Sequence, residues 1–496
     1  MKKFFYLLVV LFFTTSSSFA QKSNPSKNHR EDPYPLWVDT IVSQPNGYEM
    51  DLEGNVEISS PDGMVWLISV VNGLNGCEPN SFEGRTVKLA NDIDFGEDGL
   101  NYCFSPIGTR ETPFLGTFDG NGHKIHRLLQ RYSRYDGINN YYFDMGVFGY
   151  IRHATVKNVT LDSTCRISAS CDYPDYYRGG MVGFADSLSM VDNIYIHSPG
   201  IGFSYGSSLV GMNRNSTVRN CACGGRNFYF GSPEEGAALV AYNRSEGGYA
   251  DAIVENCYFY GRIGGSYSTW YISSLVCFNE TVPNNNGKLA IIRNCHSTPT
   301  HDFMGFRAYG MFAAILSEGS RIEFCYADPT KMYQYAQMVG INQGGELMYC
   351  SEYTNIDGVG TLALPVIING TLTDNLLDAL NLWIGEQEHP ELYRTWAIVN
   401  DSIPVFGDYY VGIPENDITN EDKVTIHPNP TDGYVIITGE NLRQAEVLNI
   451  LGQKVLGARG EGNELRIDLA TLSAGVYFVN VTDEEGRNTV QKVMKK

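Results

Sequence analysis

Short apolar segments, separated by glycines and polar residues, recur along the chain from about residue 146 to residue 350. The first half of each unit is a glycine-flanked apolar run such as "GVFGYI" (146–151). The second half, about ten residues later, follows the pattern of "VKNV". These second halves occupy residues 156–159, 191–194, 218–221, 254–257, 292–295, 322–325 and 347–350. Both halves are too short for a helix and rich in β-branched and apolar residues, which predicts β-strands.

The repeat period varies from about 25 to 38 residues. A unit of this size cannot bury its own apolar face, but it can do so when it stacks on its neighbours. The predicted fold of the main domain is therefore all-β, a right-handed parallel β-helix with coils about 4.8 Å apart. Equivalent residues of successive coils would then lie directly above one another.

In-register stacking turns each position of the second half into a column. The first column is apolar and is expected to point into the core: Val156, Val191, Val218, Val254, Ile292, Ile322 and Leu347. The next column is expected to face outward, and its charges alternate in sign: Lys157, Asp192, Arg219, Glu255, Arg293 and Glu323. Opposite charges on neighbouring strands attract, whereas like charges would repel. The alternation favours stacking in chain order.

The third column is asparagine, a residue that tolerates left-handed backbone at a bend and can bond to its equivalent in the next coil. Its members are Asn158, Asn193, Asn220, Asn256 and Asn294. A second ladder is predicted from Asn213, Asn243, Asn279 and Asn342. The sixth and seventh units, "IEFC" and "LMYC", lack this asparagine, so the first ladder should end there.

Cysteine replaces Val or Ile in the fourth column, which is the behaviour of a small buried hydrophobe. We expect free interior thiols at Cys221, Cys257, Cys295, Cys325 and Cys350. The chain has 11 cysteines, an odd number, so at least one must be free or intermolecular. The better candidates for disulfides are Cys165 with Cys171 and Cys77 with Cys103.

The stretch "PFLGTFDGNGHKI" (113–125) places Asp119, Asn121 and His123 two residues apart among glycines. They can be read as a catalytic constellation or as a tight turn. Gly and Asn supply positive φ, and an Asp side chain can cap its own turn, so we interpret the stretch as a turn. Placing Ile125 in register with Val159 would put His123 beside Lys157.

Composition narrows the possible partners. The net charge is -20, which disfavours nucleic acid and anionic membranes. Residues 1–20 combine two lysines, an apolar run and a small-residue cleavage site, which predicts a signal peptide and hence export. No later run is long and apolar enough to predict a transmembrane segment.

Catalytic and cofactor motifs are missing from the sequence. No HExxH, GxSxG or CxxC motif appears in strand–helix context, and the histidines lack metal-ligand spacing, so no catalytic residue, metal or cofactor is predicted. The close acidic pairs, Asp172 with Asp175 and Glu234 with Glu235, are interpreted as solvated loop charge. A polysaccharide-degrading enzyme is the alternative function: a glycoside hydrolase needs two positioned carboxylates, and a calcium-dependent lyase needs a carboxylate cluster with a basic group.

Aromatic segments leave the predicted coils at equivalent points, and alternation should send about half of their rings into the core. Two of these segments, 132–142 and 173–177, are rich in tyrosine and flanked by polar residues. Tyrosine gives a large contact area and a polar tip at little entropic cost. The predicted ligand-binding residues are Tyr132, Tyr135, Tyr141, Tyr142, Tyr173, Tyr176 and Tyr177.

The stretch "SSLVGMNRNSTVRNCACGG" (207–225) resembles the GLUG motif, a repeat of secreted bacterial proteins. "FLGTFDGNGHKIHRL" (114–128) resembles the opening coil of such domains, and residues 376–408 resemble their closing segment. The resemblance covers roughly residues 85–410. It implies a β-helical, adhesin-like architecture and no defined catalytic residues.

The C-terminal segment contains "PNPTDG", "NILGQKV", "LSAGVYFV" and a terminal "KVMKK". It resembles the C-terminal sorting domain of type IX secretion, which implies handling by that machinery, export through the periplasm and release or attachment at the outer surface. Alternating strands with glycine turns independently predict a small Ig-like β-sandwich here.

These observations predict a domain order and a function. The domains are a signal peptide (1–20), an N-terminal linker (21–48), a β-helix (49–412, with capping segments near 49–84 and 355–412), an acidic linker (413–423) and the sorting domain (424–496). The expected protein is secreted or displayed on the surface of a Gram-negative bacterium. It is adhesin-like and binds a host or environmental glycan or protein.

Overall fold

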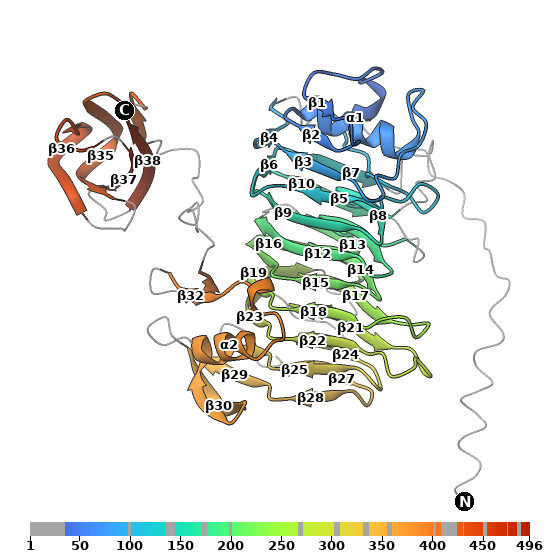
Figure 1. The fold of residues 1–496 in the computed structure, drawn as a ribbon. Coiled ribbons are helices and arrows are strands. Elements are labelled where there is room, and N and C mark those ends of the chain that lie inside the picture. Colours follow the sequence, from blue (N-terminus) through green and yellow to red (C-terminus); the bar gives the residue numbers. More distant parts are fainter. Residues whose placement is uncertain are drawn as a thin grey trace, which may run out of the picture. The chain divides into compact units, whose positions relative to one another are not determined.

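The structure is a computed structural model, and the protein is mostly β (Figure 1). It describes residues 35–97, 101–133, 144–170, 176–197, 201–265, 271–301, 308–330, 337–354, 360–399, 403–407, 424–429, 431–449, 454–473, 475–483 and 488–496. The predicted signal peptide (1–20) and the acidic linker (413–423) lie outside these residues. The chain divides into two compact units, residues 1–408 and 409–496.

Most of the first unit is a pile of parallel strands in which a strand pairs with its equivalent one repeat away (Figure 1). The pile curls, so that successive strands along the chain belong to different stacks. The first stack carries the predicted columns: β2 (Val56–Ile58), β3 (Thr86–Leu89), β5 (Thr117–Asp119), β9 (Thr155–Leu161), β12 (Met190–His197), β15 (Thr217–Arg219), β18 (Ala252–Glu255), β22 (Ala290–Arg293), β25 (Arg321–Glu323) and β28 (Glu346–Met348).

The other strands of the pile form three further stacks, each also parallel. The second stack is β8 (Phe148–Arg152), β11 (Val182–Asp186), β14 (Val210–Arg214), β17 (Val240–Ser245), β21 (Val276–Thr281), β24 (Ala308–Leu316) and β27 (Gln337–Asn342). The third is β4 (Ile93–Asp94), β6 (Lys124–His126), the ends of β9 and β12, β16 (Ala222–Ala237), β19 (Tyr258–Gly265), β23 (His296–His301), β26 (Tyr326–Ala327) and β29 (Ser351–Thr354). The fourth is β7 (Leu129–Ser133), β10 (Arg166–Ser170), β13 (Ile201–Ser207), part of β16, β20 (Tyr271–Ser273) and part of β24.

One end of the pile is closed by helix α1 (Pro61–Asn72), together with β1 (Tyr48–Met50) and the short helix η2 (Trp37–Asp39). The side chain of Ser60 caps the helix, Pro61 occupies its first turn, and Gly73 ends it with a left-handed φ of 71°. The helix buries an apolar face in the same core as the strands, which shields the first coils from water.

The inward column is confirmed for its first six members, all of which are buried. The prediction is wrong for Leu347, whose residue remains 38% exposed. Its strand, β28, pairs with β25 within the first stack and has no further strand beyond it among the described residues. A core position in the last layer therefore loses the cover that the next layer gives to the others.

The alternating charge column is confirmed, and it is longer than predicted. Glu57, Lys88 and Asp119 precede Lys157 in register, so the signs alternate over nine successive strands. Ion pairs join Arg219 to Asp192 at 2.9 Å, and other pairs link the column at 2.7–4.0 Å: Lys157–Asp119, Arg293–Glu255 and Arg293–Glu323. The charged side chain of each layer in this column thus lies next to a side chain of opposite charge in the adjacent layer.

The asparagine column occupies left-handed backbone as predicted, with φ between 49° and 59°. Asn256 donates to Asn220 at 2.8 Å and accepts from Asn294 at 2.9 Å, and Asn193 donates to Asn158. The ladder is interrupted between Asn193 and Asn220, because Asn220 donates to Asp192 instead. At the sixth and seventh positions the ladder ends, and the rings of Phe324 and Tyr349 stack at 4.9 Å in left-handed backbone.

The second asparagine ladder is confirmed for three of its four predicted members. Asn213 donates to Asn243 and Asn243 donates to Asn279, each at 2.8 Å. Asn342 is not part of it, because Leu316 occupies the intervening layer and Asn342 bonds to the backbone of Gly345.

A closing segment, residues 376–399 and 403–407, lies against the asparagine column. It contains α2 (Leu376–Gly385), η4 (Pro390–Leu392), β32 (Trp396–Ile398) and β33 (Pro404–Phe406), and it follows β30 (Thr361–Ile368) and β31 (Thr371–Asn375). Trp396 Nε1 donates to Asn256 at 2.8 Å, and Arg394 donates to Asn193 at 2.7 Å. The side chains of the asparagine column therefore find some of their hydrogen-bond partners in a segment that is distant in sequence.

The cysteine column is buried as predicted, although Cys350 near the open end is half-buried, and all five thiols are free. The suggested disulfide between Cys77 and Cys103 is wrong, since neither residue forms a disulfide. Cys103 Sγ instead lies 3.3 Å from the backbone oxygen of Arg131. Cys165 also forms no disulfide, and its thiol donates to the backbone of Ile125, whereas its suggested partner Cys171 lies outside the described residues.

The turn at 119–123 is confirmed, but its predicted register is wrong. Asn121 (φ 54°) and Gly122 (φ 80°) have left-handed backbone, and the Asp119 side chain accepts from the Asn121 amide. Asp119 itself is the partner of Lys157, and Ile125 pairs with Leu161 instead of Val159. The turn accommodates two more residues than the later bends, so His123 lies outside the charge column and contacts Asp92 at 3.1 Å.

The second unit is an antiparallel five-stranded sheet with its own core. Its strands are β34 (Thr425–His427), β35 (Tyr434–Leu448), β36 (Lys454–Asp468), β37 (Gly475–Asp483) and β38 (Asn488–Lys495). The register of β35 with β36 shifts between Thr438 and Leu442. The first half of β35 pairs with β34 and its second half with β37, so one long strand serves two groups of neighbours.

Asn256 should stabilise the first unit more than Asn158 does. Both have left-handed φ, so replacing either with Ala introduces similar strain. Asn256→Ala also removes buried hydrogen bonds to Asn220, Asn294 and the closing segment, and should lower the free energy of unfolding by about 3–4 kcal/mol, against about 1–2 kcal/mol for Asn158→Ala. Urea unfolding followed by tryptophan fluorescence measures both. Equal losses would contradict this role.

His296 should make stability depend on pH. The ring is fully buried, stacks on Tyr258 and lies with Nε2 2.9 Å from the backbone oxygen of Pro404. Burial lowers its pKa to about 4, although the bond to Pro404 opposes this shift. The unfolded chain therefore binds the proton first as pH falls below about 6.5, and stability decreases from there towards pH 4.

The matched variant for this effect is His296→Phe, which keeps an aromatic ring. Between pH 6.5 and 4 the native chain should lose on the order of 3 kcal/mol more unfolding free energy than the variant. Urea titrations at a series of pH values give the two curves. Parallel curves would show that His296 does not carry the pH dependence.

Candidate ligand-binding surface

A row of large apolar side chains, called the aromatic row below, lies on the side of the second stack that faces away from the main core; four of its five members are buried and Tyr242 is half-buried. Its members lie in register on successive strands: Tyr150, Phe184, Met212, Tyr242 and Phe278. Side chains alternate between the two faces of a strand, so these residues face away from the core that their chain neighbours Ile151 and Ala185 enter. They form clusters separate from the main core.

Charged side chains lie two residues further along the same strands. Asp186, Arg214, Arg244 and Glu280 follow one another in register. Arg214 donates to Asp186 at 2.8 Å and to Glu246 at 2.9 Å, and Arg244 pairs with Glu280 at 2.6 Å. The surface thus combines an apolar row with a row of paired charges.

The charges are coupled to the rings. The Tyr150 hydroxyl donates to Asp186 at 2.5 Å, and the Arg214 guanidinium lies 4.7 Å from the centre of the Phe184 ring. Burial disfavours ionisation of Asp186, but the bonds from Arg214 and Tyr150 outweigh it and hold the pKa of that carboxyl below its usual range. Asp186 is therefore a fixed negative charge at this surface.

Two of the predicted tyrosines reach this surface. The Tyr177 ring packs against Phe184 at 5.2 Å and Tyr242 at 5.5 Å, and Arg110 lies 5.0 Å from the Tyr176 ring. Both tyrosines are half-buried. Asp144 holds the segment in place, because it accepts from the Tyr177 amide at 2.8 Å and pairs with Arg110 at 2.7 Å.

The remaining predicted tyrosines are not brought into the surface by the described structure. Tyr132 lies in β7, where its backbone pairs with Ala169. Tyr135, Tyr141, Tyr142 and Tyr173 lie outside the described residues. These five stay predictions from the sequence.

Glu235 was missed as a candidate, and the interpretation of it as solvated loop charge is wrong. It lies in β16, is half-buried and accepts a hydrogen bond from the Tyr242 hydroxyl at 2.9 Å. Burial raises the pKa of its carboxyl, the Tyr242 bond lowers it, and the charge of Glu280 raises it, with a net upward shift. An alignment of the glycine-flanked runs on the asparagines near their ends would have placed the large apolar side chains in one column. It would not have found Glu235, which belongs to a different strand.

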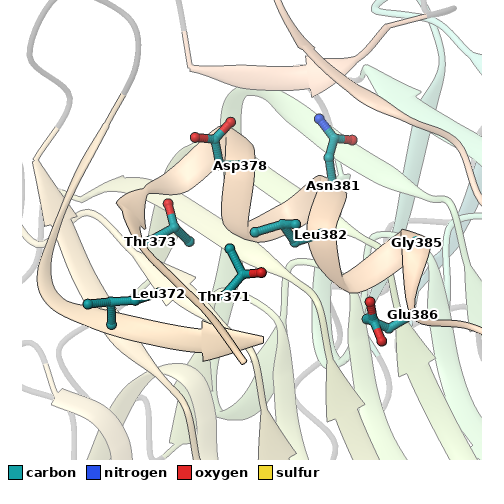
Figure 2. Close-up of a pocket in the computed structure, with 8 residues that line it drawn as sticks. All are labelled: Thr371, Leu372, Thr373, Asp378, Asn381, Leu382, Gly385 and Glu386. Carbon is teal, nitrogen blue, oxygen red and sulfur yellow. The ribbon is translucent and has the colours of Figure 1, made fainter. Parts of the chain in front are cut away.

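A pocket of about 490 Å³ lies elsewhere in the first unit, between β31 and α2 (Figure 2). Strand β31 contributes Thr371, Leu372 and Thr373, and the helix side contributes Asp378, Asn381, Leu382, Gly385 and Glu386. Asn381 is committed to the structure, since its side chain bonds both ways with the backbone of Trp396. The pocket lining lacks the aromatic rings and paired charges that meet beside the aromatic row.

Across the described parts of the chain, no group of three or more His, Cys, Asp or Glu residues is arranged to hold a metal ion. Within the same residues, none of the helices combines the length and apolar character that crossing a membrane requires.

Comparison with known families identifies the C-terminal segment. Residues 425–496 match the secretion system C-terminal sorting domain. The chain is therefore handled by the type IX secretion machinery and is exported to the cell surface or the extracellular space. The match lies outside residues 85–410, so it gives no support to the resemblance to the GLUG repeat. No curated protein matches the chain.

Removing the Tyr242 hydroxyl should raise the pKa of Glu235 further. Tyr242→Phe keeps the ring that stacks on Phe278 at 4.9 Å, but it loses the hydrogen bond that favours the ionised carboxyl. Carboxyl carbon NMR titration measures the change. Tyr249→Phe, at an 82% exposed tyrosine in a loop, should leave the Glu235 titration unchanged. An unshifted or lower pKa in Tyr242→Phe would contradict the assignment.

Proposed function

We propose that the protein is an adhesin-like, secreted or surface-displayed protein that binds a glycan where the half-buried rings of Tyr176, Tyr177 and Tyr242 meet the paired charges. The observation that carries the proposal is the meeting of Tyr176, Tyr177 and Tyr242 with ion-paired Arg and carboxylate groups on one face. Ring faces pack against the apolar C–H faces of sugars and phenol hydroxyls bond to sugar hydroxyls, while carboxylates accept from those hydroxyls and guanidinium groups donate to them.

The architecture supports this proposal. We propose that the parallel, curled pile is a right-handed parallel β-helix of GLUG-like repeats over residues 49–412, and that the second unit is an Ig-like sandwich. An in-register pile places equivalent side chains in rows along its length, which suits an extended ligand. The sorting domain takes such a surface outside the cell, where glycans of a host or the environment are available.

The partial burial of Tyr176 and Tyr177 also supports glycan binding. Tyr176 and Tyr177 are held by Arg110 and Asp144, so little conformational freedom is lost when a ligand binds. A protein ligand is the other outcome of the same chemistry, because tyrosine is equally suited to protein contacts.

The test is binding of the mature protein to a glycan array. Replacing Tyr176 and Tyr177 together with Ala should weaken binding at least tenfold, because two contact side chains are removed. Tyr249→Ala is the matched control, since that tyrosine is 82% exposed and is not a member of the row. Retained glycan binding by the double variant would overturn the proposal, and capture of a protein in place of glycans would redirect it.

A further inference from the structure

We propose that the pocket between β31 and α2 binds an extended, basic segment of a partner polypeptide, which adds as a strand to the outer edge of β31. The site uses other residues than the rings and paired charges proposed to bind glycan. Three features of the pocket carry it: an unpaired strand edge, an open helix face, and carboxylates that no cation balances (Figure 2).

Strand β31 offers a free edge to such a segment. It pairs antiparallel with β30, with Ile367 opposite Leu372 and Val366 opposite Thr373, and it pairs with no other described strand. The N–H and C=O groups along its outer edge are therefore available to another extended chain. Ile367 and Leu372 are 54% and 65% exposed, and they add apolar surface beside that edge. Main-chain bonds to a free edge give affinity, and side-chain contacts give specificity.

Helix α2 buries one face and leaves another open to the pocket. Its buried face consists of Leu376, Ala379, Leu380, Trp383 and Ile384. The residues that line the pocket follow the helical spacing of three and four on the other face: Asp378, Asn381, Leu382, Gly385 and Glu386. Thr371 and Thr373, two residues apart on β31, form the facing wall (Figure 2). The space between strand and helix, about 490 Å³, can take the side chains of an added strand.

The charge of the pocket favours a basic segment. Asp378 and Glu386 are exposed. No Lys, Arg or His lines the pocket, and neither carboxylate is ion-paired within the described part of the chain. Cationic side chains of a partner would therefore find partners here that the protein itself leaves unpaired.

The spacing of the carboxylates predicts a sequence pattern for the partner. Asp378 and Glu386 lie eight residues apart, which is about 12 Å along a helix, and Leu382 lies midway between them. An extended chain covers that span in about four residues, and every second side chain faces the same way. The expected pattern is basic–x–apolar–x–basic, with the apolar side chain against Leu382.

The same carboxylates disfavour other occupants. A second copy that paired edge to edge through β31 would bring acidic side chains of both copies together. The linker at 413–423 is itself acidic and would be repelled. A neutral glycan would meet no aromatic ring in the lining of the pocket.

The probe is a labelled, end-blocked heptapeptide of threonines with Lys, Val and Lys at its second, fourth and sixth positions. Fluorescence anisotropy with the mature protein measures its affinity, which should fall as salt is added. A peptide of the same composition with adjacent lysines should bind at least tenfold more weakly. Two further peptides carry N-methyl groups on the odd or the even amides. One should lose binding and the other keep it, because only every second amide of a strand faces its neighbour.

Two variants locate the site. Gly385→Phe fills the groove, and the fold should tolerate it, because a Cβ at this position meets no atom within 4 Å. Asp378→Asn combined with Glu386→Gln removes both charges. Each variant should weaken binding of the heptapeptide at least tenfold, and the double variant should also flatten the salt dependence. Glu318→Gln, at an exposed carboxylate outside the pocket, should bind as wild type.

Circular dichroism confirms that each variant is folded. Equal binding of the two methylated peptides would overturn strand addition, and equal binding of the peptide with adjacent lysines would overturn the spacing. Undiminished binding by folded Gly385→Phe would overturn the site, as would failure of the wild type to bind the heptapeptide. Self-association of the mature protein that Gly385→Phe abolishes would replace the basic segment with a second copy and overturn the proposed partner.

Discussion

The structure depends on parallel pairing in register between equivalent strands of successive repeats. Once each layer lies directly on the one before, every position in the repeat becomes a column, and each column needs compatible neighbours. The apolar column forms the core, and the charge column alternates in sign over nine strands, from Glu57 to Glu323. A slip of one residue would reverse the facing of every side chain in that strand. The columns therefore specify the register as well as stabilise it.

Asparagine solves a problem that this stacking creates. A bend at the same place in each layer needs left-handed backbone, and it leaves polar groups close to the core. The Asn side chains bond to one another from layer to layer, and the closing segment satisfies others through Trp396 and Arg394. The segment that ends the first unit thus completes the bends of earlier layers. The buried, neutral ring of His296 contacts this segment through the backbone oxygen of Pro404. The stability of this packing therefore depends on pH.

The same register that builds the core also builds the candidate surface. Equivalent outer positions bring Tyr150, Phe184 and Tyr242 into one row, and the next outer positions add Asp186 and Glu280. No single repeat contains this combination of rings and charges. Export through type IX secretion takes the chain to the cell surface or the extracellular space. Equivalent side chains that lie in rows along the pile can contact an extended ligand over several layers.

Local pattern by itself determined the strands, the inward column, the charge alternation, the buried thiols and the sorting domain. Each of these depends on residue type at a fixed spacing, which the chain displays directly. Tertiary structure decided the rest. Leu347 is exposed because its layer is the last, and His123 leaves the charge column because the first turn is longer. Glu235 and the closing segment reach their partners from other strands, and contacts of that kind arise only when distant parts of the chain pack together.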